Sequence, residues 1–399
     1  MTSDDMFSMY EQFVIANYGR VRVAIVRAEG SQMWDADGKR YLDLFPGWGC
    51  SMIGHCHPRV VEAIRKQAGE LIHVDNTFYT EAQGQLAKHL SEKGFGGLSF
   101  FCNSGAEANE AAIKLARRHT KPGRYRIITT EKGFHGRTYA AMSATAQSKT
   151  HVGHEPLVPG FVYVPFNDID AVAKAIDDET AAVMLEPIQG EGGVRIPDDN
   201  YLPALRELCD ENQMVLILDE VQTGCGRTGK WFGYQHTNIE PDIVTLAKAL
   251  GGGMAIGALV ARPDVAASLT PGSHASTFGG NSIAAAAAVA MFEAIEQDHL
   301  LVRVNDISQR ILDKATAFKE QFGFIEKVRG RGLMIGIELS VPGGPIASAA
   351  LERGLRINCT QDTVLRVLPA MTITDAEIDE AFDILADVLA GVENNLVST

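Results

Sequence analysis

The middle of this chain alternates short apolar segments with segments of helical period, and this alternation limits the folds that it can adopt. Segments with the length and composition of strands lie at residues 98–102, 126–130, 161–165, 181–185, 215–218, 243–247 and 256–260. Helical patterns, such as those at 106–119 and 201–212, separate several of them. Strands that are apolar on both faces and alternate with helices are typical of an α/β fold with a mainly parallel sheet.

The two ends of the chain have a different pattern. A turn signal, Asp37-Gly38, predicts a hairpin near the N-terminus. Towards the C-terminus, an alanine-rich helix at about 281–297 precedes a second helical pattern at 306–321, a glycine-rich strand pair at 332–339 and a final helix from Asp375. The C-terminal part therefore predicts a smaller α+β unit that packs against the first.

Composition excludes several classes of function. Lys and Arg total 36 against 50 Asp and Glu, so the net charge is −14, which disfavours nucleic acid and anionic membranes as partners. The six cysteines have no framework spacing, as expected of reduced thiols. The acidic start has no apolar signal-peptide core, and the longest apolar run, residues 283–292, is far shorter than the ~20 residues of a membrane span. We expect a cytoplasmic enzyme.

Three of the predicted strands are followed by an ionisable residue. Glu186, Asp219 and Lys248 each come at or just after the end of an apolar segment. In an open parallel sheet, ligands bind beyond the carboxyl ends of the strands. We therefore expect these three side chains to share one cleft.

The chemistry of these residues indicates a particular cofactor. Partial burial of Lys248 favours a neutral amine, which can form an imine with an aldehyde. Asp219 is an anion that needs a cationic partner in an apolar setting, and a protonated pyridine nitrogen would serve. The segment NSGAEA at 103–108 follows a strand and opens a helix, whose N-terminus can bind a phosphate. Together these features predict a site for pyridoxal phosphate.

Two other sites are conceivable from the sequence. The segment GCGRTG at 224–229 matches a dinucleotide-binding pattern, and 224–230 nearly matches a phosphate-binding loop, but no helical pattern follows and Trp231 stands where the loop needs a hydroxyl. Cys50, with His55, Cys56 and His57, lacks a second ligand pair at zinc-like spacing. We therefore expect neither a nucleotide site nor a metal site.

Longer segments identify the chain as similar to a known family, the class-III (ω-type) pyridoxal-phosphate aminotransferases, and above all to its acetylornithine and ornithine members. The segments are GHCHP at 54–58, NSGAEANE at 103–110, GFHGRT at 133–138, EPIQGEGG at 186–193, LDEVQTG at 218–224, GRTG at 226–229, PDIVTLAK at 241–248 and STFGGN at 276–281. The resemblance implies fold type I, with residues 1–50 and 291–399 forming the small domain and 51–290 the large cofactor-binding domain.

The resemblance also implies roles around the cofactor, for Ser104, Gly105, Ala106, Phe134, Asp219, Gln222, Lys248 and Thr277. Lys248 would hold the cofactor covalently and then shuttle the proton. Asp219 would keep the pyridine nitrogen protonated, Gln222 would bond the phenolic oxygen, and Phe134 would stack on the ring. The first three residues would surround the phosphate. Thr277 would complete this cradle from the neighbouring subunit, so the resemblance implies a homodimer.

Substrate selection follows from the same resemblance. Arg137 would bind the donor's α-carboxylate, and Arg366 the α-carboxylate of glutamate or 2-oxoglutarate. Glu186 resembles the residue that masks this second arginine while an ω-amine reacts. Ser276 and Tyr18 would line the donor pocket.

Trp48 departs from the family, whose acetylornithine members usually place a smaller aliphatic residue there and whose ornithine members place a tyrosine. Two interpretations remain open: Trp48 walls the donor pocket, or it is an indole buried by packing.

The expected reaction is transfer of the δ-amino group of N2-acetylornithine to 2-oxoglutarate, a step of arginine biosynthesis. Ornithine, succinylornithine or another ω-amine are alternative donors. A glutamate-1-semialdehyde aminomutase type of isomerase and a non-catalytic binding protein are more distant alternatives.

Overall fold

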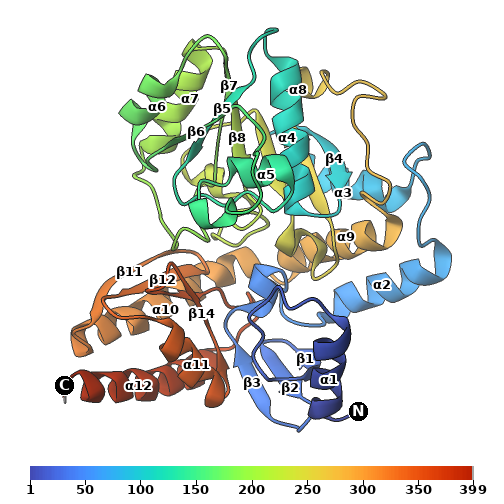
Figure 1. Cartoon of the computed structure of the whole chain (residues 1–399). Helices are drawn as coiled ribbons and strands as arrows, with labels where there is room; N and C mark the ends of the chain where they lie inside the picture. Colours follow the sequence, from blue (N-terminus) through green and yellow to red (C-terminus); the bar gives the residue numbers. More distant parts are fainter. Residues whose placement is uncertain (398–399) are drawn as a thin grey trace.

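The computed structural model describes residues 1–397 and has a seven-stranded sheet at its centre (Figure 1). The strand order is β4 (Leu98–Cys102), β10 (Gly257–Ala261), β9 (Ile243–Leu246), β8 (Val215–Asp219), β7 (Thr180–Leu185), β5 (Arg126–Thr130) and β6 (Phe161–Val164). Neighbours from β9 to β6 pair in parallel, whereas β10 is antiparallel to both β9 and β4. The predicted mainly parallel sheet is confirmed.

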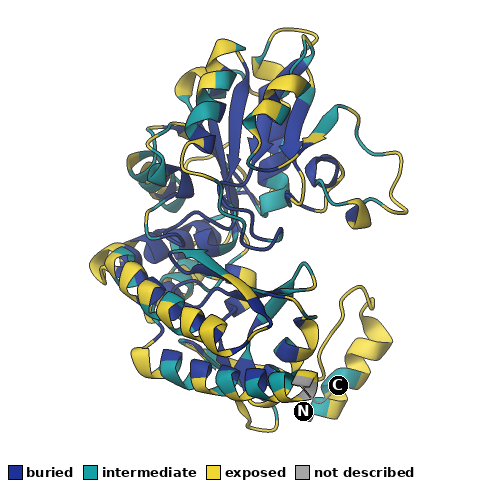
Figure 2. Cartoon of the chain, turned by 90° about the vertical axis from the view of Figure 1, so that its left-hand side faces the viewer, coloured by how far each residue is buried: buried dark blue, intermediate teal, exposed yellow. Residues whose placement is uncertain are grey.

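The central strands are buried on both faces because helices cover both sides of the sheet. Every residue of β7 and β8 is buried, and alternate residues of β7 pack into different cores: Val183 and Leu185 on one side, Ala182 and Met184 on the other. Figure 2 shows these buried strands between helices whose outer faces are exposed. The helices of this part are α2 (Pro58–Glu70), α3 (Glu81–Lys93), α4 (Gly105–His119), α5 (Tyr139–Ala144), α6 (Ile169–Ala175), α7 (Tyr201–Glu211), α8 (Pro263–Ala266) and α9 (Ser282–Gln297).

A smaller part of the molecule is built from both chain ends. Its first sheet joins β1 (Ile25–Glu29), β2 (Gln32–Asp35), β3 (Arg40–Asp43) and β13 (Leu355–Arg356), and β13 pairs in parallel with β3. Its second sheet joins β11 (Ile325–Arg331), β12 (Met334–Leu339), β15 (Val364–Val367) and β14 (Asn358–Thr360). Its helices are α1 (Ser3–Phe13), α10 (Leu300–Gln321), α11 (Gly344–Glu352) and α12 (Asp375–Val397). The hairpin predicted at Asp37-Gly38 is the connection between β2 and β3.

Two predicted elements have different limits. The helix expected from residue 306 begins at Leu300, and its N-cap is His299 in the left-handed region, which is not a residue type that announces a helix start. The strand pair expected within 332–339 spans β11 and β12, because the alternating charges of β11 hide its strand character. No helix within residues 1–397 is long and apolar enough to cross a membrane. Residues 398 and 399 of the predicted small domain lie outside the described part.

Candidate active site

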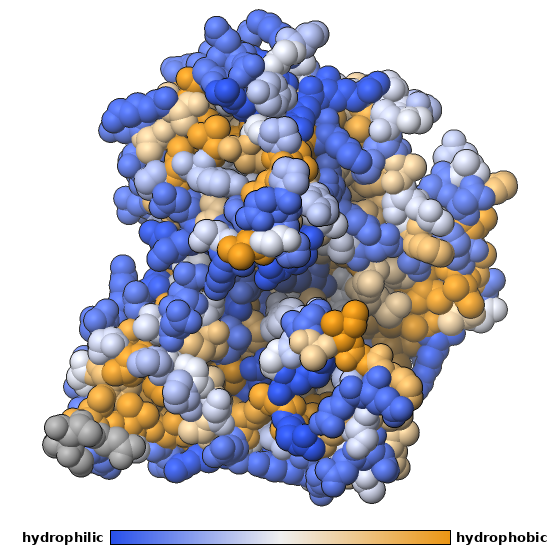
Figure 3. Space-filling view, viewed as in Figure 1, coloured by the Kyte–Doolittle hydropathy of each residue, from blue (hydrophilic) through white to orange (hydrophobic). Residues whose placement is uncertain are grey.

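The three ionisable residues that follow strands lie together. Glu186 directly follows β7, Asp219 is the last residue of β8, and Lys248 comes shortly after β9. All three line one cavity of about 430 Å³. The molecular surface is hollowed between the part that carries the large sheet and the smaller part (Figure 3). The structure therefore brings together the residues that the sequence predicts for one cleft.

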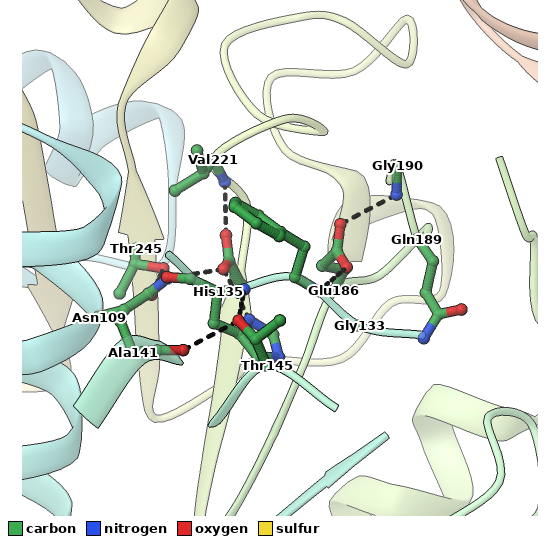
Figure 4. A network of polar contacts seen from close by, with 12 residues as sticks. Asn109, Gly133, His135, Ala141, Thr145, Glu186, Gln189, Gly190, Val221 and Thr245 are labelled. Atoms are coloured by element: carbon green, nitrogen blue, oxygen red, sulfur yellow. Dashed lines mark hydrogen bonds and ion pairs between the residues drawn. The ribbon is translucent and has the colours of Figure 1, made fainter. Parts of the chain in front are cut away.

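Asp219 is buried and is held by neutral donors. The N–H of Val221 donates to Oδ1 at 3.0 Å, while Nδ2 of Asn109 and Nδ1 of His135 each lie 2.8 Å from Oδ2 (Figure 4). Behind them, Oγ1 of Thr245 donates to the Asn109 side-chain oxygen at 2.7 Å. The carboxylate is therefore fixed in orientation by a network that reaches into α4 and β9.

The charge of Asp219 is not neutralised by this network. Nε2 of His135 is buried and has no hydrogen-bond partner among the described residues. A doubly protonated His135 ring would bury a second N–H with no acceptor, so the geometry favours the neutral ring that donates from Nδ1. Asp219 therefore presents a net negative charge to the cavity, which suits a cation such as a protonated pyridine nitrogen.

Glu186 is buried beside β7, and its carboxylate is bonded to the backbone. Its Oε1 accepts the N–H of Phe134 at 3.0 Å and its Oε2 accepts the N–H of Gly190 at 2.9 Å (Figure 4). Burial and the nearby Asp219 raise the pKa of Glu186 to about 7. The carboxyl group thus orders the loop that carries Phe134 as well as the turn after β7.

The carboxylate on Arg366 is that of Glu191, so the prediction that Glu186 masks this arginine is wrong. Arg366 lies on β15 and is 2% exposed, and its Nη1 is 2.7 Å from Oε1 of Glu191. Two backbone N–H groups retain Glu186 beside β7, whereas Glu191 lies beyond the turn at Gly190, where the chain approaches β15. Burial alone would raise the pKa of Glu191, but Arg366 and Lys248 outweigh it and the pKa is lowered.

The N-terminus of α4 forms the end of the cavity suited to an anion. Ser104 is the N-cap, and its Oγ accepts the N–H of Glu107 at 3.2 Å. The N–H groups of Gly105 and Ala106 have no acceptor within the described chain, so they remain available to a phosphate. A Cβ on Gly105 would lie 2.9 Å from a methyl of Val221, so glycine is required for the strand-to-helix turn to pack here.

The side walls of the cavity carry three more of the predicted cofactor residues, Lys248, Gln222 and Phe134. Lys248 has a left-handed backbone, with φ +47°, which sets the direction in which its side chain leaves the chain. Gln222 reaches the cavity by packing on Gly190, where a Cβ would lie 2.1 Å from its Oε1. The guanidinium of Arg137 lies 5.4 Å from the ring centroid of Phe134. These residues, with the anion site and Asp219, fit pyridoxal phosphate.

Five predicted residues do not line this cavity. Arg366 is one of them, but it contacts Glu191 and Gln222, which do line the cavity. Ser276 and Thr277 line a separate hollow at the outer side of the α4 N-terminus, although Nδ2 of Asn103 reaches Oγ of Ser276 at 3.3 Å. Tyr18 and Trp48 contact each other, with ring centroids 6.2 Å apart, and are 56% and 55% exposed. Within one chain the Trp48 ring packs on Tyr18 but is not buried, so both interpretations of Trp48 stay predictions.

Three residues of the site had no predicted role. His135 and Glu191 lie inside motifs that the sequence singles out, at 133–138 and 186–193, and Asn109 lies one helical turn after Gly105. The i, i+4 spacing from Gly105 to Asn109 is a signal that places this amide on the cavity side of the helix. No group of residues suited to a metal ion occurs among residues 1–397.

The cavity lies at the carboxyl ends of parallel strands and is lined by a lysine, a fixed carboxylate and a helix N-terminus. A smaller part built from both chain ends packs beside the large sheet. These features define a pyridoxal-phosphate-dependent enzyme of fold type I. The comparisons with known proteins narrow this class. The family model described as Aminotransferase class-III matches residues 14–389, and the chain belongs to this family. The protein is therefore a pyridoxal-phosphate-dependent aminotransferase, whose substrates are an amino donor and a keto acid.

Individual relatives agree along nearly the whole chain. The chain is 48% identical to an acetylornithine aminotransferase of Caldanaerobacter subterraneus over 97% of its length and all of that protein, and 47% identical to one of Methanocaldococcus jannaschii over 98% of its length and all of that protein. Among solved structures, an ornithine aminotransferase of Toxoplasma gondii has a TM-score of 0.94 at 33% identity, covering 99% of this chain and 96% of the other. An acetylornithine aminotransferase of Elizabethkingia anophelis has a TM-score of 0.87 at 30% identity, covering 98% of this chain and 100% of the other.

Proposed function

We propose that this aminotransferase transfers the δ-amino group of N2-acetylornithine to 2-oxoglutarate, giving N-acetylglutamate semialdehyde and glutamate. The observation that carries the proposal is the Arg366–Glu191 pair, a buried carboxylate-binding cation that the chain itself covers. The acetylornithine aminotransferases among its relatives support the choice of donor. Ornithine, succinylornithine and other ω-amines are the alternatives.

The side chains of the cavity have distinct roles in this reaction. Pyridoxal phosphate, when bound, supplies an aldehyde that takes up the amino group and a ring that stabilises negative charge. Lys248 would hold the cofactor, and its Nζ would then carry the proton that leaves and returns to the reacting carbon of the substrate. Asp219 would keep a proton on the ring nitrogen, and Gln222 would donate a hydrogen bond to the phenolic oxygen. Gly105 and Ala106 would bind the phosphate through their N–H groups.

The two half-reactions place opposite demands on Arg366. A free Arg366 would bind the donor by its α-carboxylate and present the unreactive acetylated α-nitrogen in place of the δ-amine. During the donor half-reaction Glu191 therefore pairs with Arg366, and Arg137 binds the donor carboxylate. During the acceptor half-reaction Glu191 withdraws, and Arg366 binds the α-carboxylate of 2-oxoglutarate. A single site thereby accepts two substrates of different charge distribution.

We propose further that the enzyme is a cytoplasmic homodimer whose subunits share their sites. Thr277 is exposed and does not line its own chain's cavity, as expected if it completes the neighbour's phosphate cradle. Phe278, the next residue, is a large exposed apolar side chain, and so are Phe78 and Tyr79 in the segment after α2, which Asn76 bonds to the carbonyl of Ser276. Figure 3 shows apolar surface on the side of α2. Such a patch is typical of an interface between subunits.

A panel of ω-amine donors with 2-oxoglutarate as acceptor tests the proposal. N2-acetylornithine should give the highest kcat/KM, and glutamate alone should convert the loaded enzyme to its amino form with release of 2-oxoglutarate. A higher kcat/KM for another ω-amine would reassign the donor. Absence of the glutamate reaction, together with isomerisation of an amino-aldehyde, would favour the aminomutase alternative.

A further inference from the structure

A second residue, besides Glu191, binds the Arg366 guanidinium, and it does so at the edge formed by Nε and Nη2. Asn358 of β14 pairs directly with Arg366 of β15 in the antiparallel register, so the two side chains lie on one face of the sheet. Its Oδ1 accepts from both Nε and Nη2 of Arg366, at 3.0 and 2.8 Å. The ring of Phe45 lies 4.7 Å from the guanidinium and covers its plane.

These contacts divide the guanidinium into two sides. Nε and Nη2 face the neutral amide of Asn358, while Nη1 faces Glu191 at 2.7 Å and Oε1 of Gln222 at 3.4 Å. An amide oxygen satisfies buried N–H groups without cancelling the positive charge, whereas a carboxylate at that place would pair with Arg366 permanently. The charge of Arg366 therefore remains available on the Nη1 side alone.

The strand that carries Asn358 also fixes the backbone of Glu191. Oγ1 of Thr360 and Nε2 of Gln361 donate to the carbonyl oxygen of Glu191 at 2.8 and 2.9 Å. Arg329 donates to the carbonyl oxygens of the next turn, at Gly193 and Val194. Because the main chain is held on both sides, the Glu191 carboxylate can leave Arg366 by rotation of its own side chain.

The two partners differ in exposure. The side chain of Glu191 is 34% exposed, whereas that of Arg366 is 2% exposed. Glu191 thus has solvent to rotate into, while Arg366 remains enclosed by Asn358 and Phe45. The pair is built as a fixed cation and an exchangeable anion.

We propose that Asn358 is the positioning residue of Arg366, the neutral anchor that keeps the guanidinium in place without pairing with its charge while Glu191 is exchanged for the substrate carboxylate. The inference deepens the proposed function and rests on it, since it assigns Arg366 to the dicarboxylate substrate. It predicts that Asn358 affects the glutamate and 2-oxoglutarate half-reaction and leaves the ω-amine half-reaction largely unchanged.

The test compares Asn358→Asp and Asn358→Ser with the wild-type holoenzyme. Cys359→Ser is the matched control, because Cys359 lies on the same strand and its Sγ contacts the carbonyl of Asp362 rather than Arg366. Calorimetry gives the Kd of glutarate, a dicarboxylate of the same length that cannot react. Single-turnover absorbance gives the rates with glutamate and with the best ω-amine of the donor panel, and thermal unfolding gives Tm.

Asn358→Asp should weaken glutarate binding and the reaction with glutamate by about ten- to a hundred-fold, the usual cost of a lost charge-assisted carboxylate contact. The ω-amine rate should stay close to wild type. Asn358→Ser, which keeps an uncharged acceptor, should lose less, and it replaces the aspartate variant if that variant does not fold. Equal losses in both half-reactions, or wild-type glutarate binding in both variants, would overturn the inference. A wild-type enzyme that binds no glutarate would overturn the proposed acceptor as well, whereas a different best donor would change only the proposed donor.

Discussion

At the residue scale, two buried charges, those of Asp219 and Arg366, determine what the site binds. Asp219 is oriented by Val221, Asn109 and His135 but keeps its charge, whereas Arg366 has its charge covered by Glu191. A buried, unpaired ion is costly, so the first charge favours binding of a cationic ring and the second favours a competing carboxylate. The same principle explains cofactor binding and the choice between substrates.

The two arginines should separate the half-reactions. Arg366→Ala is expected to reduce kcat/KM for glutamate and 2-oxoglutarate by about ten- to a hundred-fold, because it removes the α-carboxylate contact. Arg137→Ala should weaken the ω-amine donor as well, since Arg137 lines the exposed mouth of the cavity. Separate measurement of each half-reaction checks both expectations. Small and equal losses for both variants would show that the carboxylate sites are assigned incorrectly.

Trp48 should act on donor specificity. Its exposed ring contacts Tyr18, and Cys50, two residues along the chain, lines the cavity, so we expect Trp48 to lie near the path of the donor. Trp48→Ile is expected to change the ratio of kcat/KM for acetylornithine to that for ornithine. The change should correspond to roughly 1–3 kcal/mol of activation free energy, the usual effect of a change in pocket volume. An unchanged ratio in a variant of wild-type Tm would exclude Trp48 from the donor pocket.

At the scale of elements, the sequence predicts most accurately the features that apolar patterning determines. Strands β4 to β10 and helix α4 can be predicted to within a residue or two, and Asp219 and Lys248 are recognisable because each lies at or just beyond the end of an apolar segment. The partner of Arg366 cannot be found this way. Glu186 and Glu191 lie in the same motif, and only the fold of the turn after β7 against β15 decides which of them reaches Arg366. Contacts between a loop and a strand far along the chain are set by tertiary packing, which local periodicity does not encode.

The segment at 224–229, which resembles a nucleotide-binding loop, is a buried connection, and the neighbouring His236 makes the stability of the protein depend on pH. Nε2 of His236 lies 3.1 Å from the carbonyl oxygen of Thr228, and burial, with Arg331 and Lys230 nearby, lowers the pKa of His236 to about 4. Between pH 6.5 and about 4 the unfolded chain binds the proton and the folded protein does not, so stability falls as the pH falls through this window.

His236→Gln, which keeps a donor for the Thr228 carbonyl but cannot titrate, should therefore lose Tm less steeply than wild type as the pH is lowered from 6.5 to about 4. Thermal unfolding of both proteins across this range measures the difference. Parallel curves would show that His236 has an ordinary pKa in the folded protein.

At the scale of the whole molecule, the site is expected to need two chains. Thr277 lies outside the cavity of its own subunit, so Thr277→Asp should prevent cofactor binding by placing a charge at the partner's phosphate cradle. Subunits of Thr277→Asp mixed and reassembled with Lys248→Ala should regain activity, because each mixed dimer then contains one intact site. Mixtures as inactive as the separate variants would contradict sharing of sites between subunits.

Lys248, shortly after β9, should hold the cofactor in the cavity that Asp219 also lines. Borohydride reduction of the pyridoxal-phosphate-loaded protein, followed by peptide mass spectrometry, tests it most directly. A stable adduct is expected on Lys248, and Lys248→Ala should bind the cofactor through its phosphate and ring contacts but form no adduct and show no turnover. An adduct on any other lysine of the wild-type protein would show that Lys248 is not the residue that holds the cofactor.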